Sequence, residues 1–206
     1  MKVLLINGSP HEKGCTYTAL SLIAGELNVG GIETEILNVG TKPVGGCIGC
    51  GGCAAGSGCV FGGVVNEAIE KAKTADAFVF GTPVHYASAS GNMTSFMDRL
   101  AYAGGKYLAY KPAAICCSAR RGGTTTTLDQ LVKYPEFFHM PLVSGSYWPM
   151  VHGSDPEQVL QDAEGCAVMK ELGRNMAWLL RCIELGKQNG ITHPENPRRP
   201  MTNFIR

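Results

Sequence analysis

Four closely spaced cysteines are the part of this sequence best suited to chemistry. They follow the pattern C-x2-C-x2-C-x5-C at Cys47, Cys50, Cys53 and Cys59, and glycines lie among and beside them. Because glycine has no Cβ, the backbone between these cysteines can fold tightly and bring several sulfurs together. Thiolates gathered in this way hold iron–sulfur clusters and sometimes zinc.

Three uses of these thiols remain open from the sequence. A [4Fe–4S] cluster needs four cysteine ligands, and the run supplies four. The thiols could instead stay free or form a redox disulfide. Zinc is disfavoured, because structural zinc sites usually take their ligands from two separate pairs rather than from one compact run.

A second candidate site begins at residues 8–16, a loop that joins an apolar run at residues 2–6 to a helical pattern. Free N–H groups at the start of a helix bind phosphate well. The hydroxyls of Ser9 and Thr16 would add to such a cradle, and Lys13 would add positive charge. The loop therefore predicts a phosphate site.

Two later loops also follow predicted buried strands. In the first, Pro83 stiffens the chain, while His85 and Tyr86 offer a planar polar surface to a flat heterocycle. In the second, residues 118–124, glycines allow a ligand to approach closely. Arg120 or Arg121 in this loop would stabilise negative charge on a bound ligand.

Together these loops resemble the NADPH-dependent FMN reductase branch of the flavodoxin-like superfamily over roughly residues 1–150. Gly8-Ser9-Pro10…Gly14-x-Thr16 resembles the FMN phosphate loop of that branch. Thr82-Pro83-Val84-x-Tyr86…Phe96-x-Asp98-Arg99 resembles the signature that borders the isoalloxazine ring. Within the branch, the four cysteines resemble the compact motif of iron–sulfur flavoproteins. The chain departs from the pattern at Cys15, where a small polar residue is frequent.

The resemblance implies an FMN site built from all three loops. Its expected contacts are Ser9, Pro10, His11, Lys13, Gly14, Cys15, Thr16, Thr82, Pro83, Val84, His85, Tyr86, Ser118, Ala119, Arg120, Gly122 and Gly123. The expected metal ligands are the four clustered cysteines. No side chain stands out as a catalytic acid or nucleophile, because a flavin does the chemistry itself. Arg120 and Tyr86 are the catalytic candidates.

The loops can share one site only if strands and helices alternate along the chain. The apolar pattern predicts strands at residues 2–6, 33–39, 77–80, 113–117 and 142–148, and helices at 16–27, 64–72, 95–103, 124–133 and 156–187, the last with bends at Gly165 and Gly173. This alternation predicts a three-layer α/β fold, a five-stranded parallel sheet of flavodoxin-like order 2-1-3-4-5 with helices on both faces. We expect one domain over residues 1–206, with a cysteine-rich loop at about 43–62 and a C-terminal helix and tail at about 156–206.

Composition narrows the classes of partner. The 18 basic and 17 acidic residues form no long basic stripe, which argues against a nucleic-acid partner. The chain has neither a signal-peptide pattern nor a run of about 18 apolar residues, which argues against a membrane and predicts a cytoplasmic protein. The resemblance implies a homodimer or homotetramer. Trp148, Trp178 and residues 203–206 are candidate interface elements.

The leading prediction is an FMN-dependent oxidoreductase. Electrons would pass from NADPH or NADH through FMN to a small acceptor, such as a quinone, a flavin, an azo or nitro compound, or a metal ion. The alternative is an iron–sulfur flavoprotein that carries electrons with FMN and a [4Fe–4S] cluster and has ferredoxin-like partners. A third possibility is a flavin-free redox-sensing module built on the cysteine loop.

Overall fold

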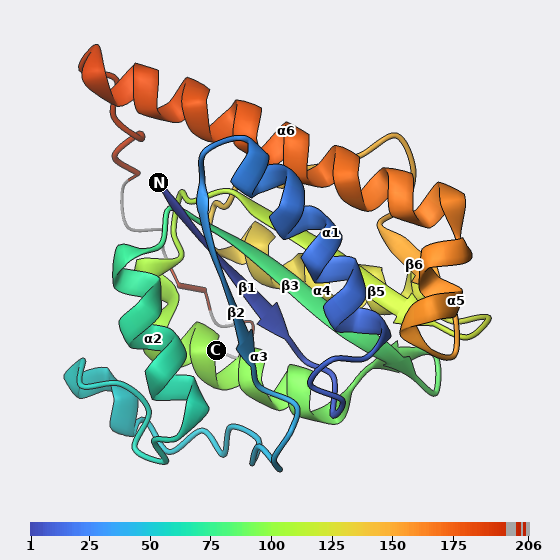
Figure 1. The fold of residues 1–206 in the computed structure, drawn as a ribbon. Coiled ribbons are helices and arrows are strands. Elements are labelled where there is room, and N and C mark those ends of the chain that lie inside the picture. The colour runs from blue at the N-terminus through green and yellow to red at the C-terminus, as the bar shows by residue number, and fades with distance from the viewer. Residues whose placement is uncertain (197–200, 203, 205–206) are drawn as a thin grey trace.

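A computed structural model describes residues 1–196, 201, 202 and 204 (Figure 1). Its strands are β1 (Lys2–Asn7), β2 (Glu33–Asn38), β3 (Ala77–His85), β4 (Ser88–Ala89), β5 (Ala113–Ala119) and β6 (Met150–His152). Its α-helices are α1 (Cys15–Val29), α2 (Val64–Thr74), α3 (Gly91–Gly104), α4 (Thr124–Phe137), α5 (Pro156–Gln161) and α6 (Ala163–Gln188). Two short 3₁₀ helices span Gly52–Ala55 and Gly105–Tyr107. No helix in the described ranges is both long and apolar enough to cross a membrane.

The sheet confirms the predicted flavodoxin-like arrangement. Its parallel strands lie in the order β2-β1-β3-β5-β6, which is the order 2-1-3-4-5 when only these strands are counted. The central strands are parallel and in register, with Asn7 at the end of β1 beside Gly81 and Gly81 beside Cys116, and β3 and β5 continue past this level in the same direction. The loops that follow β1, β3 and β5 therefore leave the sheet at one edge.

Helices cover both faces of the sheet, as the alternation along β1 requires (Figure 1). Successive side chains of a strand point to opposite faces. Val3 and Leu5 belong to the core formed with α1, α5 and α6, whereas Leu4 and Ile6 belong to the core formed with α2, α3 and α4. All four side chains are at most 1% exposed. Each face of β1 thus holds one helical layer.

The predicted strand at residues 142–148 is wrong. The last parallel strand is β6, and the earlier segment contributes a single bridge from Leu142 to Ala113. Val143 is buried in the core, but the larger apolar residues Leu142, Tyr147 and Trp148 of this segment are exposed. The remainder of the sheet differs from the prediction by the short antiparallel strand β4, which pairs with the extended end of β3.

The single helix predicted for residues 156–187 is also wrong, since the chain breaks between α5 and α6. Asp162 stands at the break and caps α6, with its Oδ1 accepting a hydrogen bond from the N–H of Gly165 at 2.9 Å. Neither Gly165 nor Gly173, where bends were predicted, interrupts the helix, because α6 runs through both positions. At Gly173 the missing side chain serves packing, since a Cβ there would lie 2.6 Å from the carbonyl oxygen of Ile23 in α1.

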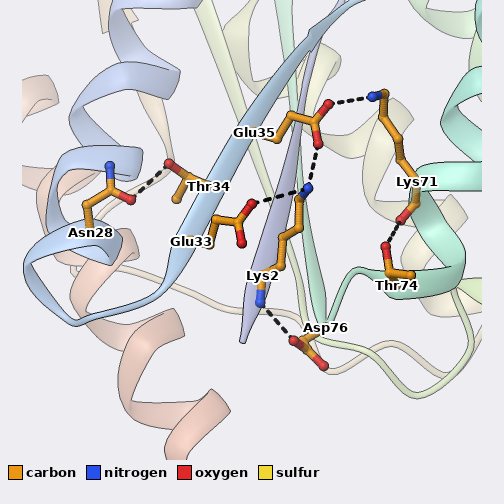
Figure 2. Close-up of polar contacts among 8 residues, drawn as sticks. All are labelled: Lys2, Asn28, Glu33, Thr34, Glu35, Lys71, Thr74 and Asp76. Atoms are coloured by element: carbon orange, nitrogen blue, oxygen red, sulfur yellow. Dashed lines mark hydrogen bonds and ion pairs between the residues drawn. The ribbon is translucent and has the colours of Figure 1, made fainter.

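An ion-pair network ties β1, β2 and α2 together at the amino ends of the strands (Figure 2). Lys2 Nζ lies 2.8 Å from Glu35 and 3.4 Å from Glu33, and Lys71 of α2 binds the other oxygen of Glu35. The hydrogen bonds from Lys2 and then Lys71 lower the pKa of the Glu35 carboxyl. This network stabilises the amino ends of the strands, whereas the candidate ligand loops lie at their carboxyl ends.

Candidate functional site

Asn7 organises the loop between β1 and α1. It is fully buried, and its Oδ1 accepts a hydrogen bond from the N–H of Ser9 at 3.1 Å. Its Nδ2 donates to the carbonyl of Glu12 at 3.2 Å and to Asn38 Oδ1 at 2.8 Å. Sequence reasoning missed this residue, although a polar side chain at the end of an apolar strand was a visible signal.

The same loop presents hydroxyls and N–H groups that suit a phosphate. Ser9 is 3% exposed, and its Oγ accepts a hydrogen bond from the N–H of His11 at 3.1 Å. The N–H groups of Thr16 and Tyr17, in the first turn of α1, have no hydrogen-bond partner among the residues described. An anion placed there would meet free donors and the positive end of the helix dipole.

Ser118 brings the loop after β5 against the phosphate loop. Its Oγ lies 2.8 Å from Thr16 Oγ1, and both residues are buried. Ser90 makes a similar link from α3, because its Oγ donates to the carbonyl of Gly8 at 2.8 Å. The carboxyl-edge loops therefore meet around one point, as the sheet register requires.

The turn between β3 and β4 is strained. Tyr86 and Ala87 have φ values of 51° and 58°, and the flanking residues pair directly, so the connection is a two-residue turn with positive φ at both positions. Asn-Gly usually fills such turns, and a larger residue there costs about 1–3 kcal/mol. The Tyr86 side chain is fully exposed. Strain of this kind often marks a ligand site.

Gly123 fits the loop after β5 closely against this turn. Its φ is 93°, and an added Cβ would lie 2.6 Å from Ala87 Cα and 2.9 Å from Val84 Cγ1. Only glycine satisfies both the conformation and the contact. The two loops predicted to border the flavin ring are therefore packed on each other, and Gly123 has a structural reason in addition to any role in binding.

The predicted flavin contacts divide by exposure. The hydroxyl-bearing and small residues Ser9, Thr16, Thr82, Ser118 and Ala119 are buried in the framework. Partly exposed are Gly14, Cys15, Pro83, Val84 and Gly123, and exposed are Pro10, His11, Lys13, His85, Tyr86, Arg120 and Gly122. Within the described part of the chain, Arg120 makes no hydrogen bond or ion pair, so its charge is available to a ligand.

The cysteine loop lies between β2 and α2, and glycines shape its backbone. Gly49, Gly51, Gly56 and Gly58 all have positive φ, which confirms that the run needs residues without a Cβ. Cys47 and Cys50 are exposed, whereas Cys53 and Cys59 are partly buried.

Cys59 is the most firmly held of the four cysteines. Asn66 of α2 accepts a hydrogen bond from its N–H at 2.8 Å and donates one to its carbonyl at 3.0 Å. Arg99 of α3 donates from Nε to its sulfur at 3.2 Å. Two helices therefore fix the end of the cysteine run, and neither contact was foreseen from the sequence.

All four cysteines line one cavity of about 230 Å³, together with Val60, Phe61, Arg99, Tyr102 and other neighbours. No three histidine, cysteine or carboxylate side chains in the described ranges converge tightly enough to hold one metal ion. A [4Fe–4S] cluster spreads four thiolates over four irons, so cysteines placed around a shared cavity fit its donor set.

The other cysteines lie outside the cysteine loop, and the surroundings of several of them disfavour the reactive thiolate form. Cys116 and Cys117 are fully buried in β5, and burial raises both pKa values, that of Cys117 to about 12. Desolvation also raises the pKa of Cys15, whose sulfur lies 3.6 Å from the carbonyl of Gly153. On a helix with an apolar pattern we would expect Cys182 to be packed, but it is exposed on α6.

The candidate interface aromatics are both on the surface. Trp148 is 56% exposed and Trp178 of α6 is 66% exposed. Trp178 therefore does not belong to the core, which is the other place where a tryptophan of the last helix could lie. Of the tail predicted to join them, Phe204 is exposed, while residues 203, 205 and 206 lie outside the described residues.

Comparison with known proteins agrees with this geometry. Residues 1–155 match the profile of a family described as NADPH-dependent FMN reductase. An iron-sulfur flavoprotein of Methanocaldococcus jannaschii is 32% identical over 197 residues, which cover 89% of this chain and 100% of that relative.

Two solved structures show the same fold. RosB with the bound intermediate 8-demethyl-8-formylriboflavin-5′-phosphate aligns with a TM-score of 0.69 at 14% identity, covering 100% of this chain and 92% of RosB. A flavodoxin from the domain Archaea aligns with a TM-score of 0.60 at 14% identity, covering 88% of this chain and 99% of the flavodoxin. The fold is therefore flavodoxin-like.

Proposed function

We propose that this chain, which belongs to the NADPH-dependent FMN reductase family, is an iron–sulfur flavoprotein. It would transfer electrons with FMN and a [4Fe–4S] cluster. The observation that carries this proposal is the placement of Cys47, Cys50, Cys53 and Cys59 around one cavity. The relative from Methanocaldococcus jannaschii, which matches over nearly the whole chain, supports the same conclusion.

The residues of the phosphate loop would hold FMN by its phosphate. The hydroxyls of Ser9 and Thr16 would donate hydrogen bonds to phosphate oxygens. The free N–H groups of Thr16 and Tyr17 would donate further hydrogen bonds beside them. For Thr16 this means exchanging its hydrogen bond with Ser118 for one with the ligand. The first turn of α1 thus provides orientation as well as affinity.

The strained turn and the loop after β5 would border the ring. Residues 82–86 would supply one edge, with Tyr86 exposed at its tip, and residues 118–123 would supply the other. When bound, FMN supplies the ability to accept electrons in pairs and release them singly. Arg120 forms no ion pair in the described part of the chain. Its positive charge would therefore be available to stabilise negative charge on the reduced ring.

The four thiolates of the cysteine loop would each bind one iron. When bound, the cluster supplies one-electron transfer to or from a partner, for which a ferredoxin-like protein is the proposed class. Cys47 and Cys50 are exposed, so this end of the site faces solvent and would be accessible to such a partner. The partly buried Cys53 and Cys59 would anchor the opposite side.

The test is the content of flavin and iron in protein purified without oxygen. The proposal predicts about one FMN and about four irons per chain. Replacing Cys53 by Ser should abolish iron binding and leave flavin binding intact, whereas the control Cys182→Ser, on the exposed face of α6, should change neither. Protein with flavin but without iron would refute the cluster, and protein without flavin would refute the whole proposal.

The family description supports a second candidate, a reductase driven by NADPH or NADH that passes electrons to a small acceptor. The free charge of Arg120 beside the proposed ring site favours it. Stopped-flow reduction separates the two, because a reductase is reduced rapidly by nicotinamide and an electron carrier only by a one-electron donor. If hydride transfer operates, Arg120→Ala should slow reduction by NADPH about 10-fold or more. An unchanged rate would remove Arg120 from the mechanism.

A further inference from the structure

Arg99 is a buried cation that faces the cysteine loop. Its residue is 7% exposed on α3, and Nε donates to Cys59 Sγ at 3.2 Å. The guanidinium carbon lies 5.7 Å from the centre of the Phe61 ring. In the described chain no carboxylate forms an ion pair with it, and the neighbouring Asp98 instead accepts a hydrogen bond from Tyr134 at 2.6 Å.

The same guanidinium joins the two ends of the cysteine loop. One terminal nitrogen donates to the carbonyl of Gly45 at 3.3 Å, just before the first cysteine. The other donates to the carbonyl of Gly62 at 2.9 Å, just after the last. The planar fork of arginine can make these bonds together, which the single ammonium of lysine cannot.

A buried charge without a counter-ion is unfavourable unless something negative lies nearby. The negative groups that could satisfy Arg99 are the thiolate of Cys59 and whatever that thiolate binds. Reduction of a [4Fe–4S] cluster by one electron adds one negative charge to that centre. Hydrogen bonds to the cluster sulfurs and the local net charge are among the factors that set its reduction potential.

We propose that Arg99 is a positioning residue for the metal centre. Arg99 closes the cysteine loop and stabilises the reduced state of the cluster. The stabilisation rests on the cluster proposed above, whereas the closure of the loop does not. The hydrogen bond from Arg99 Nε to the Cys59 sulfur and the unneutralised charge of the guanidinium both favour the more negative, reduced form of the cluster. Arg99 therefore raises the reduction potential and eases electron entry.

The test is a potentiometric titration of the cluster with dithionite as reductant and mediators present, followed by the magnetic resonance signal of the reduced form. Arg99→Gln should shift the reduction equilibrium at least about tenfold toward the oxidised form, which is about 59 mV for one electron. Arg99→Lys should recover part of this shift, because it keeps the charge. Arg174→Gln, which removes an exposed cation of α6, is the matched control and should leave the potential unchanged.

A second measurement covers variants that fail to assemble the cluster. Thermolysin cuts before large apolar residues such as Ile48, Val60 and Phe61, so its cleavage rate in iron-free protein reports how firmly the loop is held. Both Arg99 variants should be cut there several-fold faster than the wild type and the Arg174→Gln control. Equal cleavage rates would overturn the anchoring role.

The outcomes also distinguish this inference from the proposed function. A wild-type potential in fully iron-loaded Arg99→Gln protein would overturn the electrostatic role while the cluster stands. A wild-type protein that binds no iron would overturn the cluster, and with it the effect on potential. The thermolysin result would then still decide whether Arg99 closes the loop.

Discussion

Gly40 gives the sharpest test of the phosphate site. It follows β2, and an added Cβ would collide with the backbone of Gly8 and Ser9, in the loop proposed to bind phosphate. Backbone atoms cannot rotate away as a flexible side chain can, so Gly40→Ala should push the phosphate loop out of place. Forcing a methyl group into a closely packed site costs about 1–3 kcal/mol.

If displacement of the loop accounts for that energy, FMN should bind about 5-fold to 150-fold more weakly, because 1.4 kcal/mol corresponds to a factor of ten. Riboflavin shares the ring and lacks the phosphate, so its affinity should stay within about twofold. Flavin fluorescence measures both dissociation constants in the apoprotein. Because riboflavin must still bind, the comparison also shows that the variant is folded.

The matched control is Gly25→Ala. Gly25 is exposed on α1 with open space around its Cα, so alanine there should leave both ligands unaffected and add about 0.5–1 kcal/mol of stability. Two results would contradict the reasoning. One is an unchanged FMN affinity in Gly40→Ala, and the other is a loss of riboflavin affinity by the same factor.

Three further predictions concern stability and thiol chemistry. Lys2 and Lys71 lower the pKa of Glu35 below its ordinary 4.5, so the stabilisation is present above that pH and disappears as the pH falls through the lower folded value. The difference in unfolding free energy between wild type and Glu35→Gln should therefore shrink below about pH 4, and a constant difference would argue against the ion pairs. Gly123→Ala should destabilise the protein by about 1–3 kcal/mol in urea denaturation. Gly122 has open space around it and no positive φ, so Gly122→Ala should change the free energy of unfolding by less than about 0.5 kcal/mol. Equal effects of the two substitutions would refute the packing argument. Burial and raised pKa values should protect Cys116 and Cys117 from iodoacetamide at about pH 8 until the protein is unfolded, as peptide mass spectrometry would show, and labelling of either in folded protein would contradict the assignment.

The parallel sheet was predictable because its signals are local and agree with one another. Residues 2–6 are a short apolar run that ends in a loop with glycine and proline, and the run is buried on both faces as such runs usually are. The hydroxyls and helix start of residues 8–16 likewise follow directly from sequence. These features do not depend on contacts between distant parts of the chain.

The missed elements depend on distant contacts or on strain. The β3–β4 hairpin turns at Tyr86-Ala87, and neither residue favours positive φ, so no turn signal was present. Residues 142–148 contain several large apolar side chains, yet only Val143 is buried, whereas Leu142, Tyr147 and Trp148 lie on the surface. The break before α6 had a signal, since Asp is a good N-cap, but the surrounding helical pattern concealed it at Asp162.

The signature around Asp98-Arg99 shows how a motif can be correct as a pattern and incomplete as a guide to contacts. Adjacent residues of a helix point about 100° apart. Asp98 therefore faces Tyr134 of α4, whereas Arg99 faces the cysteine loop. The sequence pattern associated both residues with the flavin ring, although the contacts made by Arg99 belong to the cysteine loop.

This division gives α3 a role that neither motif suggests alone. At its start, Ser90 caps the helix and binds the carbonyl of Gly8 in the phosphate loop. Nine residues later, Arg99 binds the two ends of the cysteine loop. At 1.5 Å per residue, the two attachment points are separated by roughly 14 Å along the helix axis. Because a helix of this length is rigid compared with the loops, α3 holds the proposed flavin and cluster sites at a set separation, which transfer of electrons between them requires.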